Sequence, residues 1–294
     1  MEDPIIIKAH TSHIPGVLFN HDSKTLISVG MDNSIKLWSV DSWNLVDTFE
    51  GHEKSVNTLA LSPDGTKLVT GSTDSTVKIW AYPSGRILHT LRGHKKTVAA
   101  VDISPNGKLI ASASYDSTVK MWSLSSGEEL VTLTGHKRNV GSIAFSTDDK
   151  TLVSGGIGNE IYLWSIPSGK IIDKLLGHEV AVASLVFSSD GQYLASAGHE
   201  GTVKLWSTKN WSELRTFELH AKGVFPLAFS PDCKTLAVGT EYSVRTYSIK
   251  NGSLLQKFPL KVKGVYHLAF SPNGRWLAVA SADKRIRIYN FQDA

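Results

Sequence analysis

Serine or threonine, histidine and aspartate recur together in this sequence, and these residue types form the catalytic triads of hydrolases. A tryptophan follows each group at a constant distance, and the whole set returns after 42 residues. The three complete sets are His10, Ser28, Asp32 and Trp38; His52, Thr70, Asp74 and Trp80; and His94, Ser112, Asp116 and Trp122. A catalytic triad needs one exposed nucleophile held by one base, so three copies indicate a structural role. An enzyme would instead show a polar cluster confined to one repeat. The sequence shows none, so we expect no catalytic residue.

The histidines invite a second interpretation, because imidazole is the commonest metal ligand in proteins. Six of the eleven histidines fall on the 42-residue period. No two histidines have the i, i+4 spacing of a helical zinc site, and no His-Glu pair continues to His-Glu-x-x-His. The sequence also contains no Gly-x-x-x-x-Gly-Lys-Ser/Thr loop and no dinucleotide fingerprint. We therefore expect no metal site and no cofactor.

The 42-residue period covers the whole chain, whose 294 residues equal seven such units. Each unit has the pattern of β-structure, with short apolar segments separated by turns rich in Gly, Pro, Asp and Ser. In the unit around Trp80 these segments are 55–61, 67–70, 76–80 and 86–91. Four strands without a helical stretch predict one four-stranded antiparallel sheet per unit. One such sheet cannot bury both its faces, whereas seven arranged radially can.

The spacing of Gly-His, Ser or Thr, Asp and Trp resembles that of the WD-repeat β-propeller family over residues 4–291. The Trp-Asp dipeptide usual in this family is absent, because Ser, Ala or Asn follows each aromatic residue. The resemblance implies an all-β, seven-bladed β-propeller of four-stranded antiparallel blades, forming a single domain over residues 1–294. It also implies that each tetrad is a buried network, in which Trp N–H reaches the hydroxyl, the hydroxyl reaches His, and His reaches Asp. Repeats 4 to 7 depart from the tetrad, for example at Gly158, Glu200 and Lys261, so we expect packing to hold their blades more than this network.

The two ends of the chain predict how the ring closes. Only five residues follow Tyr289, so the seventh repeat lacks its own fourth strand. Residues 4–9 align with the fourth-strand segment of the second repeat, and we expect this N-terminal strand to complete the last blade and cover its open edge. Trp43 and Trp211 replace the glycine of a Ser-Gly turn, and we expect each to cover the edge of its own blade.

The resemblance also implies a binding face. WD-repeat proteins commonly bind peptides or protein surfaces around the channel mouth, on the face that carries the Gly-His loops and the Asp turns, here called the top face. Residues just before each Asp position and five after each His position should project there. The candidate partner-binding residues among them are Met31, Tyr115, Ile157, His199, Phe225 and Tyr266. Exposed aromatic and apolar side chains are typical binding anchors, although the alternative is that they fold over their neighbours and plug the channel.

Charge is concentrated on the same rim, although the net charge of the protein is only +4. Cations at or directly after the His positions are Lys54, Lys95, Lys96, Lys137, Arg138, Lys222, Lys261 and Lys263. Only Glu53 and Glu179 oppose them, so we expect a basic rim that is densest over blades 3 and 4, at Lys95, Lys96, Lys137 and Arg138. Such a field would attract an acidic or phosphorylated partner, and the alternative is a merely solvated lysine rim. A nucleic acid is the weaker candidate.

Two functional hypotheses follow from these features. The first is a non-enzymatic scaffold for protein–protein interaction, which binds peptide or protein partners on the top face around the central channel. The second is a reader of acidic ligands, either phosphorylated peptide or nucleic acid, through the basic rim. In both cases the protein would act as a monomer or as a subunit of a larger complex.

Composition limits the setting in which the protein works. With 41% hydrophobic and 20% charged residues it resembles an ordinary globular protein rather than a disordered chain. The sequence has no run of 18 apolar residues and no signal-peptide pattern, so we expect no membrane partner. Its single cysteine, Cys233, excludes an internal disulfide and fits a reducing compartment. We expect a cytoplasmic protein, with the nucleus as the alternative.

Overall fold

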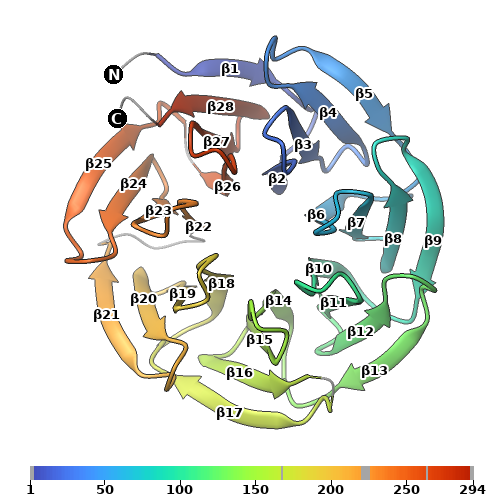
Figure 1. Cartoon of the computed structure of the whole chain (residues 1–294), viewed down its shortest axis with the longest axis vertical. Helices are drawn as coiled ribbons and strands as arrows, with labels where there is room; N and C mark the ends of the chain where they lie inside the picture. The colour runs from blue at the N-terminus through green and yellow to red at the C-terminus, as the bar shows by residue number, and fades with distance from the viewer. Residues whose placement is uncertain (1–2, 167, 220–225, 263, 292–294) are drawn as a thin grey trace.

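The computed structural model describes residues 3–166, 168–219, 226–262 and 264–291. Within these residues the chain forms 28 β-strands, which group into seven four-stranded antiparallel sheets. The sheets are arranged as the blades of a ring around a central channel (Figure 1). The predicted seven-bladed β-propeller is therefore confirmed.

The first three blades are each built from four consecutive strands. Blade 1 contains β2 (Gly16–Phe19), β3 (Thr25–Val29), β4 (Ile35–Ser39) and β5 (Leu45–Phe49). Blade 2 contains β6 (Val56–Leu61), β7 (Lys67–Ser72), β8 (Thr76–Ala81) and β9 (Arg86–Arg92). Blade 3 contains β10 (Val98–Ile103), β11 (Leu109–Ser114), β12 (Val119–Ser123) and β13 (Glu129–Leu133).

The remaining blades follow the same order, except that the last one takes its outer strand from the N-terminus. Blade 4 contains β14 (Val140–Phe145), β15 (Thr151–Gly156), β16 (Glu160–Ser165) and β17 (Ile171–Leu176). Blade 5 contains β18 (Val182–Phe187), β19 (Tyr193–Gly198), β20 (Thr202–Ser207) and β21 (Glu213–Glu218). Blade 6 contains β22 (Leu227–Phe229), β23 (Thr235–Gly239), β24 (Ser243–Ser248) and β25 (Leu254–Pro259). Blade 7 contains β26 (Val265–Phe270), β27 (Trp276–Ser281), β28 (Arg285–Asn290) and β1 (Ile5–Lys8).

Burial follows the position of a strand along the radius of the ring. The first strand of every blade lines the channel, and the fourth forms the perimeter (Figure 1). The second and third strands are covered on both faces by neighbouring blades, so that every residue of β15 is buried. The fourth strand has a free edge, and in β17 only Leu175 is buried. This arrangement explains why small and apolar residues fill the centres of the second strands, as in β11 with the sequence LIASAS.

The recurring aromatic residue of the third strand packs into the seam with the preceding blade. Trp80 of blade 2 is fully buried, in one cluster with Ile27, Val29 and Phe49 of blade 1. Trp122 packs in the same way against blade 2. The core is therefore a series of seams between blades, and each blade depends on both neighbours for the burial of its apolar side chains.

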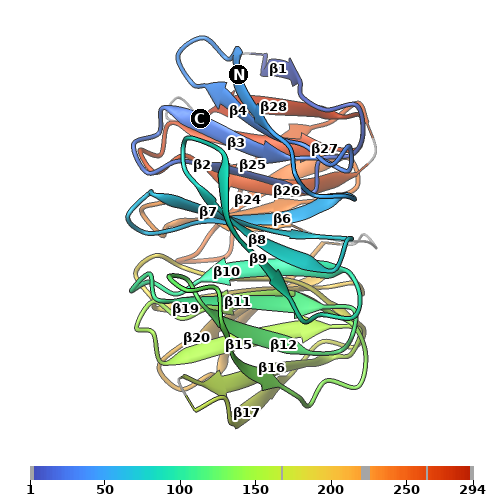
Figure 2. The same ribbon diagram turned by 90° about the vertical axis from the view of Figure 1, so that its right-hand side faces the viewer.

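The strands run between the two faces of a disc, which Figure 2 shows from its edge. Turns between the first and second strands share one face with turns between the third and fourth strands. In blade 2 these two turns are joined by a hydrogen bond from the Tyr82 N–H to the Thr66 carbonyl (2.8 Å). The turns between the second and third strands lie on the opposite, top face with the connections between blades. There the Thr73 N–H donates to the Ser55 carbonyl (2.9 Å).

The ring closes through the N-terminal strand, as predicted. β1 pairs antiparallel with β28, with Ile5 opposite Ile288 and Ile7 opposite Ile286. Ile7 lies in one core cluster with residues of blades 7 and 1. Both chain ends therefore lie beside blade 7 (Figure 1), and no first or last blade carries an uncovered face.

The two turn tryptophans differ in what they cover. Trp211 packs against Phe187 of its own blade, with ring centroids 6.3 Å apart. Trp43 instead packs edge-on against Trp276 of blade 7, with ring centroids 5.4 Å apart. The expectation that each covers its own blade was wrong for Trp43, because its side chain reaches across the seam where the ring closes.

Closure through β1 can be tested with two neighbouring residues. Ile7 is 6% exposed and faces the core, whereas Ile6 is 51% exposed. We expect Ile7→Asp to lower the free energy of unfolding by more than about 2 kcal/mol, because it buries an unpaired carboxylate and removes apolar packing. Ile6→Asp adds the same charge on the solvent side and should have a small effect. Urea unfolding measures both, and equal stabilities would contradict a role for β1 in closure.

Candidate functional site

The three complete tetrads form the same chain of hydrogen bonds on the top side of blades 1, 2 and 3. In blade 1 the Trp38 Nε1–H donates to Ser28 Oγ (2.9 Å), which lies 2.8 Å from His10 Nε2. His10 Nδ1 lies 2.9 Å from Asp32 Oδ1. The corresponding distances are 2.9, 2.8 and 2.8 Å in blade 2 and 2.8, 2.8 and 2.9 Å in blade 3. The hydroxyl groups of Ser28, Thr70 and Ser112 belong to fully buried residues, so they act here as links in a network.

The carboxylate of each tetrad also holds the Gly-His loop against the neighbouring turn. Asp116 accepts the backbone N–H of Lys95 (2.9 Å), and Asp74 accepts that of Glu53 (3.1 Å). A threonine hydroxyl two residues on donates to the same carboxylate, as Thr76 does to Asp74 (2.6 Å). Although burial opposes it, hydrogen bonds from His52 and Thr76 hold the pKa of Asp74 well below its usual range. The carboxylate is therefore the group that joins two top-face loops within one blade.

Blade 5 contradicts the expectation that blades 4 to 7 depend less on this network. Ser196 lies between Trp206 (2.8 Å) and His178 (2.7 Å), and the longer Glu200 reaches both His178 and Thr202. The four members of the blade 5 tetrad are therefore joined, although Glu200 Oε2 is buried without a hydrogen-bond partner among the described residues.

Blades 6 and 7 differ from the others. In blade 7 the buried Arg287 donates to Asp283 Oδ2 (2.7 Å) and to Ser281, which replaces the histidine link by an ion pair. In blade 6 the histidine of the period, His220, lies outside the described residues.

Blade 4 retains the buried part of its tetrad but has lost the acid. The Trp164 Nε1–H donates to Ser154 Oγ (2.7 Å), which lies 2.7 Å from His136 Nε2. Gly158 stands where the other blades have a carboxylate. Among the described residues, neither His136 Nδ1 nor the Lys137 N–H has a hydrogen-bond partner. Burial lowers the pKa of His136 to about 4, so its imidazole is neutral at physiological pH.

A polar cluster that occurs only in blade 4 surrounds this histidine. The Tyr162 ring lies 4.1 Å from the His136 ring, and the Tyr162 hydroxyl donates to Glu160 Oε2 (2.9 Å). Lys174 Nζ lies 3.1 Å from Glu160 Oε1 and 4.3 Å from the Tyr162 ring centroid. The expectation that no polar cluster is confined to one repeat was therefore wrong. An alignment of the repeats would have pointed to this cluster, because Tyr162 stands where blades 1, 2, 3 and 5 have a lysine.

The predicted anchors lie on different blades around the top face. Their exposed fractions are 42% for Met31, 41% for Tyr115, 48% for Ile157 and 38% for Tyr266. The structure brings Tyr266 and Met31 together across the closure seam through His13. The His13 ring lies 5.2 Å from the Tyr266 ring, and the His13 carbonyl accepts the Met31 N–H. His199 is half-buried, and Phe225 lies outside the described residues.

The predicted cations of blades 3 and 4 are accessible. Lys95, Lys96, Lys137 and Arg138 are all exposed, and none forms an ion pair within the part of the chain that the structure describes. Of the other rim cations, Lys54 and Lys261 are exposed, whereas Lys222 and Lys263 lie outside the described residues. Tyr115 and Ile157 lie on the same two blades, so apolar and cationic side chains share this sector of the top face.

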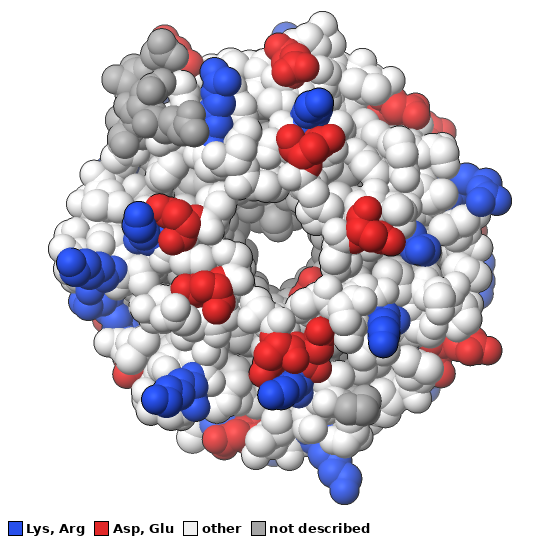
Figure 3. All heavy atoms as spheres, in the orientation of Figure 1, with Lys and Arg blue, Asp and Glu red and all other residues white. Residues whose placement is uncertain are grey.

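The opposite face has a different charge pattern. Figure 3 shows that face, on which acidic side chains lie close to the mouth of the channel over several blades. Turns between first and second strands supply carboxylates there, at Asp22, Asp64, Asp148, Asp190 and Asp232. Lys and Arg side chains lie beside several of these carboxylates, so this face has mixed charge (Figure 3), whereas the predicted cations of blades 3 and 4 have no ion-pair partner among the described residues.

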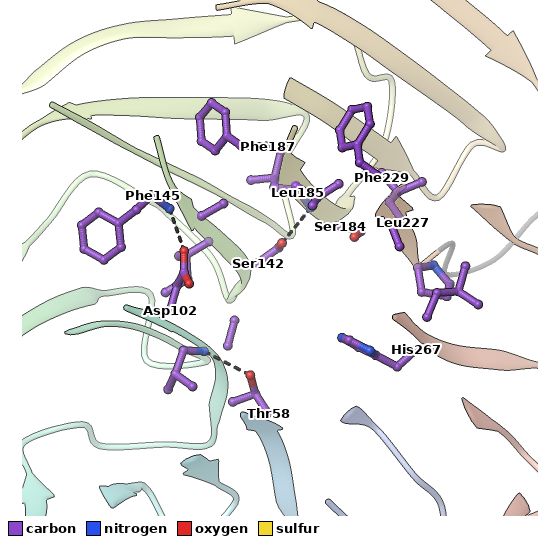
Figure 4. Close-up of a pocket in the computed structure, with 18 of the residues that line it drawn as sticks. Thr58, Asp102, Ser142, Phe145, Ser184, Leu185, Phe187, Leu227, Phe229 and His267 are labelled. Atoms are coloured by element: carbon purple, nitrogen blue, oxygen red, sulfur yellow. Dashed lines mark hydrogen bonds between the residues drawn. The ribbon is translucent and has the colours of Figure 1, made fainter. Parts of the chain in front are cut away.

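The central channel forms a cavity of about 670 Å³ lined by the first strands of the blades. Around the wall of this channel, polar side chains of one first strand hydrogen-bond to the first strand of the next blade (Figure 4). Thr58 Oγ1 accepts the Val101 N–H (3.2 Å), and Ser142 Oγ accepts the Leu185 N–H (2.9 Å). These bonds link neighbouring blades where no β-ladder connects them.

Asp102 is the charged member of this wall and was missed by the sequence analysis. Its carboxylate accepts the backbone N–H groups of Phe145 (2.8 Å) and Ile103 (2.9 Å). Burial raises the pKa of Asp102 to about 6 in spite of these bonds. An alignment of the repeats would have revealed Asp102, because the equivalent residues of the other blades are all apolar. They are Leu18, Ala60, Ala144, Val186, Ala228 and Ala269.

Neither a metal centre nor a membrane span is found within the described residues. They contain no group of three or more His, Cys, Asp or Glu side chains arranged to hold a metal ion. They also contain no helix of the length and hydropathy required to cross a bilayer.

The ring of seven four-stranded blades with tetrads at the top defines a β-propeller built from sequence repeats. Six segments of the chain match the family described as WD domain, G-beta repeat, at residues 3–39, 43–81, 85–123, 127–165, 169–207 and 252–290. Because these segments cover most of the chain, the protein belongs to the WD-repeat family, whose propellers generally serve as protein-interaction scaffolds. The unmatched stretch, residues 208–251, contains the first three strands of blade 6, where the repeat is one residue short. No curated protein matches the chain.

The tetrad carboxylate should be important for stability. We expect Asp116→Ala to lower the free energy of unfolding by about 1–3 kcal/mol, because His94 Nδ1 and the Lys95 N–H lose their acceptor. Asp41→Ala removes an exposed carboxylate from a turn on the opposite face and is the control, with almost unchanged stability. Thermal or urea unfolding compares the two. A loss of the same size in both variants would show that the network contributes nothing specific.

The raised pKa of Asp102 predicts a pH-dependent stability. The folded chain holds this proton up to about pH 6, whereas the unfolded chain loses it near 3.8, so rising pH between these values destabilises the fold. Relative to Asp102→Ala, the unfolding free energy of the wild type should fall by up to about 3 kcal/mol from pH 4 to pH 7. Alanine is the matched residue because blades 2, 4, 6 and 7 carry it here. Urea unfolding of both proteins from pH 4 to pH 7 measures this difference in unfolding free energy. A difference that stays constant with pH would contradict the prediction.

Proposed function

We propose that this chain is a non-enzymatic scaffold that binds an acidic peptide or protein surface on the top face over blades 3 and 4. The observation that carries the proposal is the group of exposed, unpaired cations Lys95, Lys96, Lys137 and Arg138. Exposed Tyr115 and Ile157 lie on the same blades and supply apolar contact area.

This combination suits a protein partner because each part makes a different contribution. Aromatic and apolar anchors supply most of the affinity in protein interfaces. Complementary charge raises the association rate and rejects partners of the wrong sign. The carboxylates around the opposite mouth of the channel are interspersed with Lys and Arg side chains, so that face presents a mixed charge to an acidic partner (Figure 3).

A second candidate is a reader of phosphate groups, in a phosphorylated peptide or a nucleic acid. The same unpaired cations support it, since they have no acidic partner among the described residues. The two candidates differ in salt dependence. Binding to a phosphate backbone weakens steeply between about 50 and 200 mM salt because counterions are released. Binding through apolar anchors should change much less.

Affinity capture from the native lysate tests the proposal with two charge-reversal variants of equal size. Lys95→Glu with Lys137→Glu alters the top face of blades 3 and 4. Lys108→Glu with Lys150→Glu alters exposed lysines on the opposite face of the same blades. We expect the first pair to lose captured partners by about tenfold or more, because electrostatic complementarity is reversed. The second pair should retain them.

Capture after nuclease treatment and at two salt concentrations separates a protein partner from a nucleic acid. A partner that survives nuclease and changes little with salt supports the scaffold. If every captured partner remains on the top-face variant, the assignment to that face is wrong.

A further inference from the structure

The tetrad of blade 4 lacks its carboxylate but keeps the two hydrogen-bond donors that a carboxylate binds in the other blades. The place of the missing carboxylate, next to Gly158, is called the gap below. In blades 1, 2 and 3 one acidic side chain accepts His Nδ1 and the backbone N–H of the next residue. Asp32, for example, accepts His10 Nδ1 (2.9 Å) and the Thr11 N–H (2.8 Å). The three copies define where a carboxylate sits relative to these two donors.

Blade 4 retains both donors in a fixed position. His136 is held by Ser154 on one side and by the Tyr162 ring on the other. Since the Trp164 N–H donates to Ser154 Oγ, the serine hydroxyl is free to donate to His136 Nε2. The proton of the neutral imidazole is then on Nδ1, which is the atom that faces the acid in the other blades.

The space in front of these donors is open. A Cβ atom added at Gly158 would meet no atom within 4 Å, and residues 157–159 are all exposed. The turn also differs from its counterparts, because Asn33, Ser75 and Ser117 have φ near +70° whereas Asn159 has no such conformation. No described atom therefore obstructs a side chain that begins at Gly158, and His136 Nδ1 has no acceptor among the described residues.

The charges around the gap favour an anion. Lys137 and Arg138 belong to the same loop, and both are exposed and free of ion pairs with described residues. Glu160 is the nearest acid, but it is bound by Lys174 (3.1 Å) and by the Tyr162 hydroxyl (2.9 Å). Because Glu160 remains close, a singly charged carboxylate is tolerated better than a doubly charged phosphate.

We propose that an Asp or Glu side chain of the partner enters the gap at Gly158 and completes the tetrad of blade 4 in trans. Its carboxylate would accept His136 Nδ1–H and the Lys137 N–H, as the resident acids of the other blades do. The inference rests on the proposed binding of an acidic partner at the top face. It adds the atoms that recognise one acidic side chain of that partner.

The test uses a tetraglutamate peptide as probe and a tetraglutamine peptide for comparison. Binding is followed by ¹⁵N NMR at the His136 imidazole and the Lys137 amide of the full chain. We expect tetraglutamate to shift both resonances in a saturable way and tetraglutamine to leave them unchanged. Shifts confined to other residues would overturn the proposal.

Two variants with the same charge change sharpen the test. Gly158→Asp should place a carboxylate in the gap in cis, weaken tetraglutamate binding by tenfold or more, and raise the melting temperature. Asn159→Asp adds the same charge one residue later, at a position whose counterpart Asn33 bonds the Glu53 carbonyl and not the tetrad histidine. Its affinity should stay within about threefold of the wild type, as expected for a screened surface charge. Equal weakening by both variants would show a general charge effect and reject the site. If Gly158→Asp melts no higher than the wild type, the NMR shifts of the wild-type protein decide alone.

The outcome is distinguishable from failure of the broader proposal. If His136 and Lys137 do not respond while Lys95→Glu with Lys137→Glu still loses its captured partner, the top face binds without a carboxylate in blade 4. If that variant retains every partner while the NMR shifts appear, the carboxylate site exists but the proposed scaffold function is wrong.

Discussion

Pairing of β1 with β28 is the interaction on which the rest of this structure depends. The core clusters lie in the seams between blades, so a blade has no adequate core of its own. A ring gives every blade two neighbours, but only if the seventh blade has its outer strand and meets the first. β1 supplies that strand, and the contact of Trp43 with Trp276 adds a second link across the same seam. Closure therefore makes seven weak units into one cooperative structure.

The tetrads stabilise single blades, not the contacts between blades. Packing in the seams holds the blades together, whereas the tetrad joins two loops of one blade through a buried carboxylate. Glu200 in blade 5 shows that a longer acid meets this requirement, whereas Asp283 in blade 7 pairs with Arg287 of its own hairpin instead. Top-face loops are thus held at their bases while their outer residues, such as Tyr115 and Ile157, are free to vary.

The architecture could be predicted from the sequence because the constant spacing of residues reveals those structural features that every repeat shares. Seven units, four strands per unit, the tetrads and the closing strand all follow from the 42-residue register. Contacts between different blades are not encoded in that register. Trp43 against Trp276, and Asp102 with the Phe145 N–H, join residues whose proximity depends on the size and curvature of the ring. The cluster of Glu160, Tyr162 and Lys174 was visible as three departures from the repeat, at positions that carry Ser or Thr, Lys and Thr in blades 1, 2, 3 and 5, but its meaning required the neighbouring His136.

Departures from the repeat are also where the two faces of the disc acquire different chemistry. A network that lacks one member leaves polar donors without a partner, and such donors are costly unless water or another acceptor satisfies them. Blade 4 has this defect at an exposed position beside Lys137 and Arg138, where an external group can reach the donors. A buried defect would only weaken the fold, as an orphaned histidine in a seam would. At the surface the same defect would give the ring a directional contact for an anion under the proposed binding mode, because the fold has already oriented the donors that a partner must satisfy.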